Sequence, residues 1–83
     1  MQIIKISSLG CTSCILVNNV LEKILENYKI HVKELDYDFD DFSYEVGKTL
    51  PVLIFLDNNG NELSRLVGEV SYEEVENEIK KLQ

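Results

Sequence analysis

Cys11 and Cys14, two cysteines three positions apart, have the clearest capacity for chemistry in this sequence. They fall where a run of β-branched residues ends and an amphipathic run begins, so we expect them at the first turn of a helix that follows a strand. That position places both sulfur atoms within disulfide reach and directs the first toward the helix N-terminus, whose unpaired N–H groups favour a thiolate. The pair is therefore predicted to close and reopen as a redox switch.

Length and composition limit the class of protein and the partners that are compatible with this cysteine pair. A chain of 83 residues with 45% hydrophobic and 28% charged residues is expected to form one globular domain, residues 1–83. Its formal charge of −7 argues against nucleic acid and anionic membranes as partners, because phosphate binding needs an excess of Lys and Arg. The longest apolar run, residues 50–56, is too short to span a bilayer.

The N-terminus carries no recognisable signal peptide, so we expect a cytoplasmic protein. In a reducing cytosol, paired cysteines are more often redox-active or metal-binding than a structural disulfide. The location therefore favours chemistry at the two cysteines over a purely structural cross-link.

Hydrophobic periodicity predicts the elements that must hold the cysteines. Residues 2–8 contain a run of isoleucines and predict an interior strand. Apolar residues at three- and four-residue spacing over 13–28 predict an amphipathic helix, and alternation over 29–36 predicts a second strand. A strand, a helix and a strand in this order form a βαβ unit with parallel strands.

The second half of the chain is predicted to add a short helix, a hairpin and a last helix. The short helix is expected at 44–48, capped by Asp40, Asp41 or Ser43. The apolar run at 52–56 predicts a buried strand and 63–67 its return strand, because Asn58-Asn59-Gly60 between them is a turn signal. The last helix is expected at 72–82, with Ser71 as its cap and Glu74 completing a capping box.

The predicted order resembles the minimal thioredoxin fold. The residues that carry the resemblance are Cys11-x-x-Cys14, Thr49-Leu50-Pro51 before the third strand, and Gly60 and Gly68 around the final hairpin. The chain is closer to thioredoxin than to glutaredoxin, because glutaredoxins usually carry Gly-Gly soon after that strand and this sequence does not. The resemblance implies an α/β fold of order βαβαββα, with a four-stranded mixed sheet and helices on both faces.

The same resemblance implies site residues around the cysteines. In the thioredoxin family the proline is cis and lies against the cysteine pair, and the backbone before it binds an extended substrate segment. Pro51 is therefore expected to be cis and Leu50 to contact substrate. Thr12 and Ser13, which separate the cysteines, join them as expected substrate-binding residues. No cofactor and no metal ligand is expected.

This sequence departs from the thioredoxin pattern around the motif. Thioredoxins usually carry Trp before the first cysteine and Gly-Pro between the two, where this chain has Gly10 and Thr12-Ser13. They also carry a buried Asp six positions before the first cysteine and a Lys on the neighbouring strand, where this chain has Lys5 and Glu34. We interpret the latter two as a charge-swapped pair that helps to ionise a thiol. The competing interpretation is that both are solvated at a sheet edge.

The predicted function is that of a protein-disulfide reductase, a thiol-disulfide oxidoreductase. The Cys11 thiolate attacks a substrate disulfide, and Cys14 then attacks Cys11 in the mixed disulfide and releases the reduced substrate. Expected partners are disulfide-containing proteins and a reductase, either a thioredoxin-reductase-like flavoprotein or a glutathione system. A monomer that serves electron transport and cell redox homeostasis is expected.

Two alternatives use the same cysteines. The motif before an amphipathic helix also resembles a heavy-metal-associated domain, in which two thiolates hold Cu(I). Those domains usually have Met two positions before the first cysteine, where this chain has Leu9, and their element order is βαββαβ. The other alternative is an inactive thioredoxin fold that only binds partners. His31 and the acidic segment 36–41 are interpreted as solvated.

Overall fold

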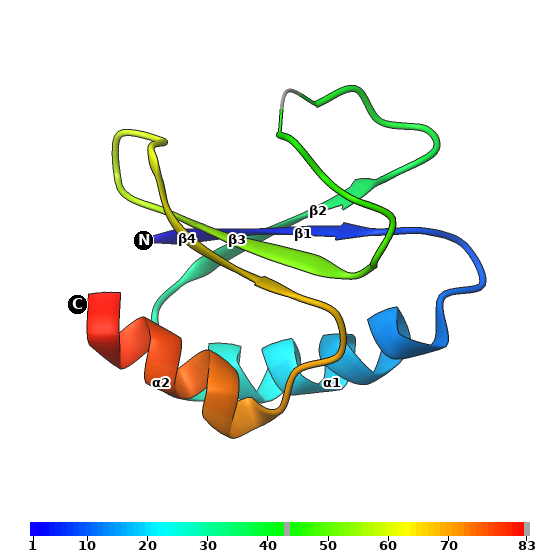
Figure 1. Ribbon diagram of the computed structural model, residues 1–83. Helices are drawn as coiled ribbons and strands as arrows, with labels where there is room; N and C mark the ends of the chain where they lie inside the picture. The colour runs from blue at the N-terminus through cyan, green and yellow to red at the C-terminus, as the bar shows by residue number, and fades with distance from the viewer. Residues whose placement is uncertain (43, 83) are drawn as a thin grey trace.

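The computed structural model describes residues 1–42 and 44–82, and Figure 1 shows a sheet with helices on one side. Helix α1 (Thr12–Asn27) follows the first strand, and helix α2 (Tyr72–Leu82) ends the described chain. The spatial strand order is β2-β1-β3-β4, in which β1 and β2 are parallel and the other pairs are antiparallel. The strands are β1 (Gln2–Ser7), β2 (His31–Asp36), β3 (Val52–Leu56) and β4 (Glu62–Val67). The predicted α/β architecture with a four-stranded mixed sheet is confirmed.

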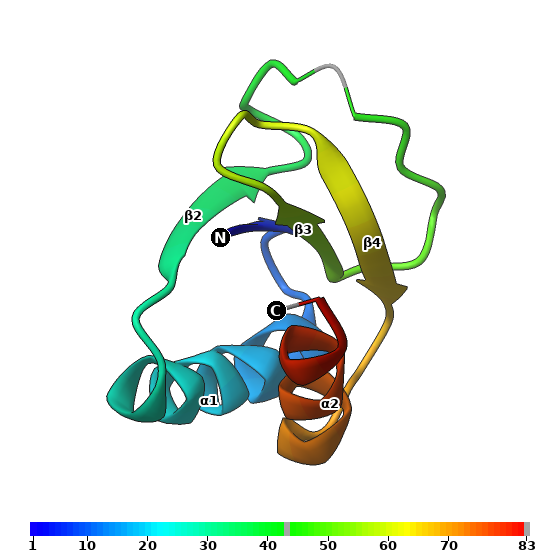
Figure 2. The same cartoon turned by 90° about the vertical axis from the view of Figure 1, so that its left-hand side faces the viewer.

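The central strands β1 and β3 are buried on both faces, which explains the continuous apolar run of β3 and the isoleucines of β1, among which Lys5 is the one charged residue. On one face, Ile3, Leu53 and Phe55 pack against the two helices. The helix residues that complete this core recur at three- and four-residue spacing, as the sequence predicts: Val17, Leu21, Ile24, Val75 and Ile79. The helices lie side by side beneath the sheet (Figure 2).

Residues 37–42 and 44–51, which contain no helix, cover the opposite face of the sheet. Phe42, Tyr44 and Val46 are partly buried against an apolar cluster of β1 and β3, namely Ile4, Ile6, Val52, Ile54 and Leu56. The three covering side chains recur at every second position, a spacing that suits extended backbone lying on a sheet and gives no helical stripe.

Two details of the predicted fold are therefore wrong. Residues 44–48 form no helix, and both helices of the described chain pack on one face of the sheet (Figure 1). Asp40 and Asp41 consequently cap nothing, and the third proposed cap, Ser43, lies outside the described residues. The element order over the described residues is βαβββα.

Both helices begin after a residue whose side chain caps them, and the cap at Ser71 agrees with the sequence prediction. Cys11 is the N-cap of α1, and the Ser71 hydroxyl accepts a hydrogen bond of 3.2 Å from the backbone N–H of Glu74 at the start of α2. Within the described residues, no helix is both long and apolar enough to cross a membrane.

Candidate active site

The cysteine pair lies at the connection between β1 and α1. The strand ends at Ser7, and Gly10 turns the chain with φ of +76°, a conformation that glycine adopts without steric cost. Cys11 keeps extended backbone angles as the N-cap residue, so its side chain projects back over the first turn of the helix. Its Sγ accepts a hydrogen bond of 3.2 Å from the Cys14 backbone N–H.

This capping contact favours a negative charge on Cys11. The N–H groups of the first helical turn have no partner within the helix, and the positive end of the helix dipole lies at the same place. A thiolate at the N-cap is stabilised by both, which is how helix N-termini lower the pKa of cysteine thiols. The sequence prediction placed the first sulfur at this position.

The two cysteines form a disulfide and differ in accessibility. Their Cα atoms are 5.2 Å apart, within the usual range for a disulfide. Cys11 is partly exposed, whereas Cys14 is the first buried residue of α1 and is only 4% exposed. An incoming sulfur can therefore reach Cys11, while Cys14 is shielded beneath it.

Pro51 lies at the same end of the sheet as the cysteines. Val52 pairs with Ile6 near the end of β1, so Pro51 precedes β3 where β1 leads into the Cys11 turn. The peptide bond between Leu50 and Pro51 is cis, as the resemblance predicted. Pro51 is buried and Leu50 partly buried.

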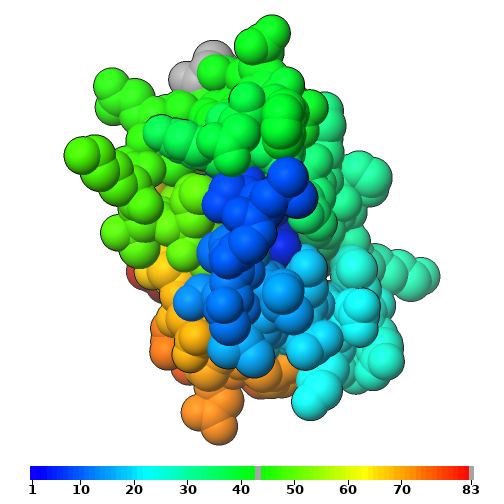
Figure 3. All heavy atoms as spheres, turned by 90° about the vertical axis from the view of Figure 1, so that its right-hand side faces the viewer, coloured from blue at the N-terminus to red at the C-terminus, as the bar shows by residue number. Residues whose placement is uncertain are grey.

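Hydrogen bonds join the segments that meet at this end of the sheet. The Pro51 carbonyl accepts a bond of 2.8 Å from the Gly68 N–H, and the Ser13 hydroxyl donates to Glu69 Oε1 at 3.4 Å. Thr12 is exposed beside them. Figure 3 views this end of the molecule, where the segment leading to the cysteines (blue) lies between the 37–51 segment (green) and α1 (cyan). Whether Leu50, Pro51, Thr12 and Ser13 bind substrate stays a prediction.

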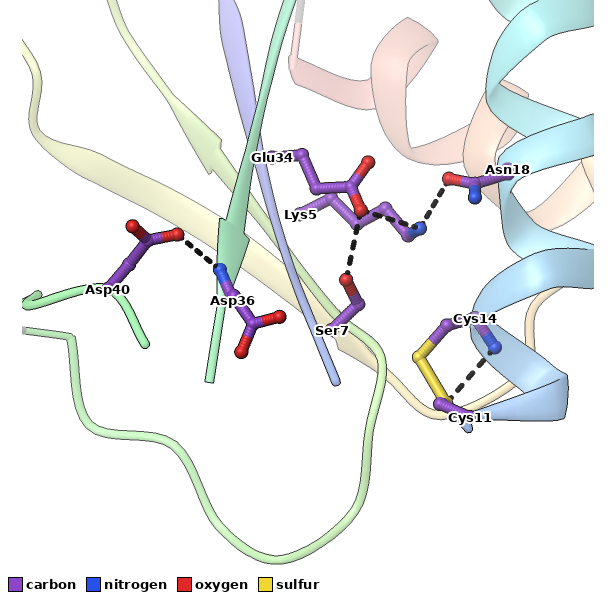
Figure 4. Close-up of polar contacts among 8 residues, drawn as sticks. All are labelled: Lys5, Ser7, Cys11, Cys14, Asn18, Glu34, Asp36 and Asp40. Atoms are coloured by element: carbon purple, nitrogen blue, oxygen red, sulfur yellow. Dashed lines mark hydrogen bonds and ion pairs between the residues drawn. A yellow bond between two sulfur atoms is a disulfide. The ribbon is translucent and has the colours of Figure 1, made fainter. Parts of the chain in front are cut away.

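Lys5 lies behind the cysteines, buried between β1 and α1. Its ammonium donates a hydrogen bond to Asn18 Oδ1 on α1 and lies 3.9 Å from Glu34 Oε1 (Figure 4). Glu34 is paired with Lys5 across the parallel strands, as predicted, and also accepts a bond of 3.1 Å from the Ser7 hydroxyl. The charge-swapped pair therefore exists.

Burial dominates the electrostatics of Lys5. Loss of hydration lowers the pKa of its ammonium, and the negative charge of Glu34 opposes that change only in part. The pair borders a pocket of about 340 Å³ that Glu22 and Asn18 also line. The interpretation of both residues as solvated is wrong for Lys5, which is 1% exposed.

Sequence reasoning missed Asn18 and the exposed apolar residues near the pair. Asn18 is the polar interruption of the apolar stripe of α1, four positions after Cys14, and that interruption was a readable signal. Leu9, Ile15 and Leu16 are exposed to 77%, 62% and 47%. Their positions outside the apolar stripe of the predicted helix were the sequence signal that could have identified them as exposed.

The other candidate residues take no part in this site. His31 is exposed, and the carboxylates of the acidic segment accept backbone N–H groups of their own loop, such as Asp40 Oδ2 from the Asp36 N–H at 2.7 Å (Figure 4). Across residues 1–42 and 44–82, no group of three or more His, Cys, Asp or Glu side chains is placed to hold a metal ion.

No family model and no curated protein sequence matches the chain. Solved structures do: thioredoxin-2 of the malaria parasite superposes with a TM-score of 0.80 at 22% identity, over 96% of this chain and 81% of that one. Thioredoxin 1 of Thermosipho africanus gives 0.76 at 22% identity, over 99% and 93%. Thioredoxin of Schistosoma mansoni gives 0.73 at 20% identity, over 96% and 76%. The chain has a thioredoxin-like fold, as predicted from its sequence.

Proposed function

We propose that this protein is a thiol-disulfide oxidoreductase that reduces protein disulfides with Cys11 and Cys14. One observation carries the proposal: Cys11 is a partly exposed N-cap whose sulfur accepts the Cys14 N–H, while Cys14 is buried and bonded to it. An accessible nucleophile and a shielded second sulfur are the two components that disulfide exchange needs. The thioredoxin-like fold supports the proposal without establishing the activity.

The reaction begins with the reduced protein. The Cys11 thiolate attacks one sulfur of a substrate disulfide, the substrate S–S bond breaks, and the other substrate sulfur leaves as a thiolate that takes a proton from water. Cys14 then loses its proton to water and attacks Cys11 Sγ. The bond between Cys11 and the substrate breaks, and the second substrate thiolate leaves. Two electrons have passed to the substrate, and the protein holds the Cys11–Cys14 disulfide.

The proposed docking surface surrounds Cys11. Leu50 and Pro51 supply backbone next to the motif, and Thr12 and Ser13 form the first turn of α1, so an extended substrate segment would bind across these residues. The proposed partners are disulfide-containing proteins in the cytoplasm. A thioredoxin-reductase-like flavoprotein or a glutathione system would return two electrons to the disulfide.

The metal-carrier alternative finds less support. A heavy-metal-associated domain has the order βαββαβ, whereas the described residues of this chain have the order βαβββα, with the second helix after β4. Two thiolates alone can still bind Cu(I), so the experiment must include the metal.

The test combines insulin reduction by the dithiol form with anaerobic Cu(I) titration against a chromogenic chelator. We expect the wild-type protein to accelerate insulin precipitation by dithiothreitol and Cys11→Ser to lose that acceleration. Stoichiometric retention of Cu(I) without insulin reduction would select the carrier. Neither activity would select the fold that only binds partners.

A further inference from the structure

Lys5 is a charged residue in a place where charge is costly. Among the described residues, only Lys5 and Ser7 are buried and polar, and Lys5 is the charged one. Removing an ammonium from water has a large cost in free energy, and the attraction to Glu34, which is itself solvated, offsets little of it. An apolar side chain of similar length would fill the same space at lower cost, so the fold itself does not require this residue.

The ammonium of Lys5 points toward the helix that carries the cysteines. It donates to Asn18 on α1, and Asn18 follows Cys14 by four residues, which is one helical turn on the same face. Side chains so related have Cβ atoms about 5–6 Å apart. Figure 4 shows Lys5 reaching from β1 toward Asn18, with the disulfide at the start of the same helix.

The other charged side chains that line the pocket beside Lys5 or bond to the first turn of α1 are carboxylates. Glu22 from α1 and Glu34 from β2 line the pocket beside Lys5, and Glu69 from the segment after β4 is bonded to Ser13. The strand β3 and the segment before it contribute the uncharged Leu53 and Pro51. Carboxylates disfavour a thiolate, so Lys5 supplies the opposing positive charge on the buried side of α1.

We propose that Lys5 is a positioning residue that favours the thiolate of Cys14 and thereby speeds the resolution of the mixed disulfide. This inference rests on the proposed function and assigns the ammonium to the second, buried cysteine instead of the first. In that step Cys14 gives its proton to water, forms a bond to Cys11 Sγ, and displaces the substrate sulfur as a thiolate. Lys5 keeps its own proton throughout and stabilises the charge on Cys14 through the poorly screened interior.

The step can be isolated with 5,5′-dithiobis(2-nitrobenzoic acid) in stopped flow. The reduced protein releases one coloured thiolate when Cys11 attacks and a second when Cys14 resolves the mixed disulfide. A rise of one unit in a thiol pKa cuts the thiolate fraction about tenfold, while its higher nucleophilicity restores about threefold. We therefore expect Lys5→Met to slow the second release about threefold at pH 7 and to leave the first unchanged.

The pH profile separates an electrostatic role from a structural one. The difference in second-release rate between Lys5→Met and wild type should narrow as the pH rises, because Cys14 ionises in both proteins at high pH and Lys5, whose pKa is lowered by burial, loses its own charge. A second release slowed equally at every pH, or not slowed at all, would overturn the proposal. The matched control is Lys33→Met, an exposed lysine on β2, which should leave both phases unchanged.

Glu34→Gln gives an independent test on a residue whose side chain is 58% exposed. Because it removes a negative charge beside Lys5, the second release should be equal to wild type or faster. If Glu34→Gln slowed the second release as much as Lys5→Met does, the contact between the two side chains, and not the charge of Lys5, would control the rate. That result would overturn the proposal. If wild type released a single thiolate, as Cys14→Ser should, the proposed function itself would fail, which is a separate outcome.

Discussion

Lys5 and Glu34 are direct partners across the parallel strands β1 and β2, with charged atoms 3.9 Å apart, yet one side chain is 1% exposed and the other 58%. The two are therefore not a buried ion pair. Water hydrates the carboxylate, while the ammonium depends on Asn18 and on a partly screened attraction. This asymmetry explains why burial lowers the pKa of Lys5 despite its acidic neighbour.

Lys5→Met should therefore stabilise the oxidised protein near neutral pH, by about 1 kcal/mol, because a buried charge is replaced by an apolar chain of similar length. The folded-state pKa of Lys5 lies below its unfolded value of about 10.4, so the unfolded chain binds more protons between the two values. The free energy of unfolding of the wild-type protein therefore rises with pH between the two pKa values. The difference in stability between Lys5→Met and wild type becomes smaller over the same pH range. Urea unfolding from about pH 6 to 10 checks both points.

Lys33→Met is again the control and should change the free energy of unfolding by less than about 0.5 kcal/mol. A Lys5→Met protein less stable than wild type at neutral pH would contradict the account of Lys5 as a cost to the fold.

The second prediction concerns Tyr28, whose hydroxyl donates to Glu76 Oε2 at 2.9 Å and so links the end of α1 to α2. This bond lowers the pKa of Glu76 and raises that of Tyr28. A carboxylate with a lowered folded-state pKa gives stability that is present above its unfolded pKa, about 4.3, and is lost as pH falls through the folded value. Tyr28→Phe should therefore be less stable than wild type at pH 7, and the gap should close in acid.

Urea unfolding at a series of pH values between about 3 and 8 measures that gap. Tyr37→Phe, in the segment after β2, is the matched control and should keep the wild-type pH dependence. A gap between wild type and Tyr28→Phe that stayed constant down to the lowest pH would show that the lost hydroxyl acts without Glu76.

Much of the fold follows from short-range patterns. The isoleucines of β1 and the apolar run of β3 are buried on both sides, and the spacing of Val17, Leu21 and Ile24 gives α1 its core face. The position of Cys11 at the start of α1 could likewise be predicted from local sequence. The cis bond before Pro51, in contrast, came from the resemblance, because neither propensity nor periodicity favours a cis peptide at a given proline.

The parts that could not be predicted depend on long-range packing. Phe42 and Tyr44 pack on the sheet because this removes the apolar face of β1 and β3 from water. The sequence of the covering segment alone does not reveal that contact. The burial of Lys5 required knowing that α1 crosses β1 at this position. Asn18 belongs to the site because α1 packs on β1 and brings its side chain within hydrogen-bond distance of Lys5.

The third prediction concerns Gly68, which has φ of +85° and donates its N–H to the Pro51 carbonyl. An added Cβ would meet the Thr49 methyl group at 3.5 Å, an ordinary contact, so the strain of Gly68→Ala comes from the backbone. We expect a loss of about 1–2 kcal/mol in the free energy of unfolding. Gly47→Ala, which meets no atom within 4 Å and has no positive φ, should be neutral or stabilising by about 0.5 kcal/mol.

Denaturant unfolding of the two variants side by side decides the point. Equal effects of the two substitutions would mean that the backbone at Gly68 relaxes freely, and the bond to Pro51 would then not hold that segment in place.

The last prediction is that Cys14→Ser traps the mixed disulfide. Cys11 keeps its N-cap position and its access to solvent, so the first attack proceeds, but a serine hydroxyl at neutral pH cannot displace the substrate sulfur. The variant should accumulate close to one covalent adduct per chain with a peptide disulfide, which mass spectrometry detects and dithiothreitol reverses. Cys11→Ser should form far less adduct over the same time, because its remaining thiol at Cys14 is 4% exposed. Equal adduct yields in the two variants would mean that the difference in burial does not assign the roles of the two sulfurs, and turnover by Cys14→Ser at the wild-type rate would exclude the two-cysteine mechanism.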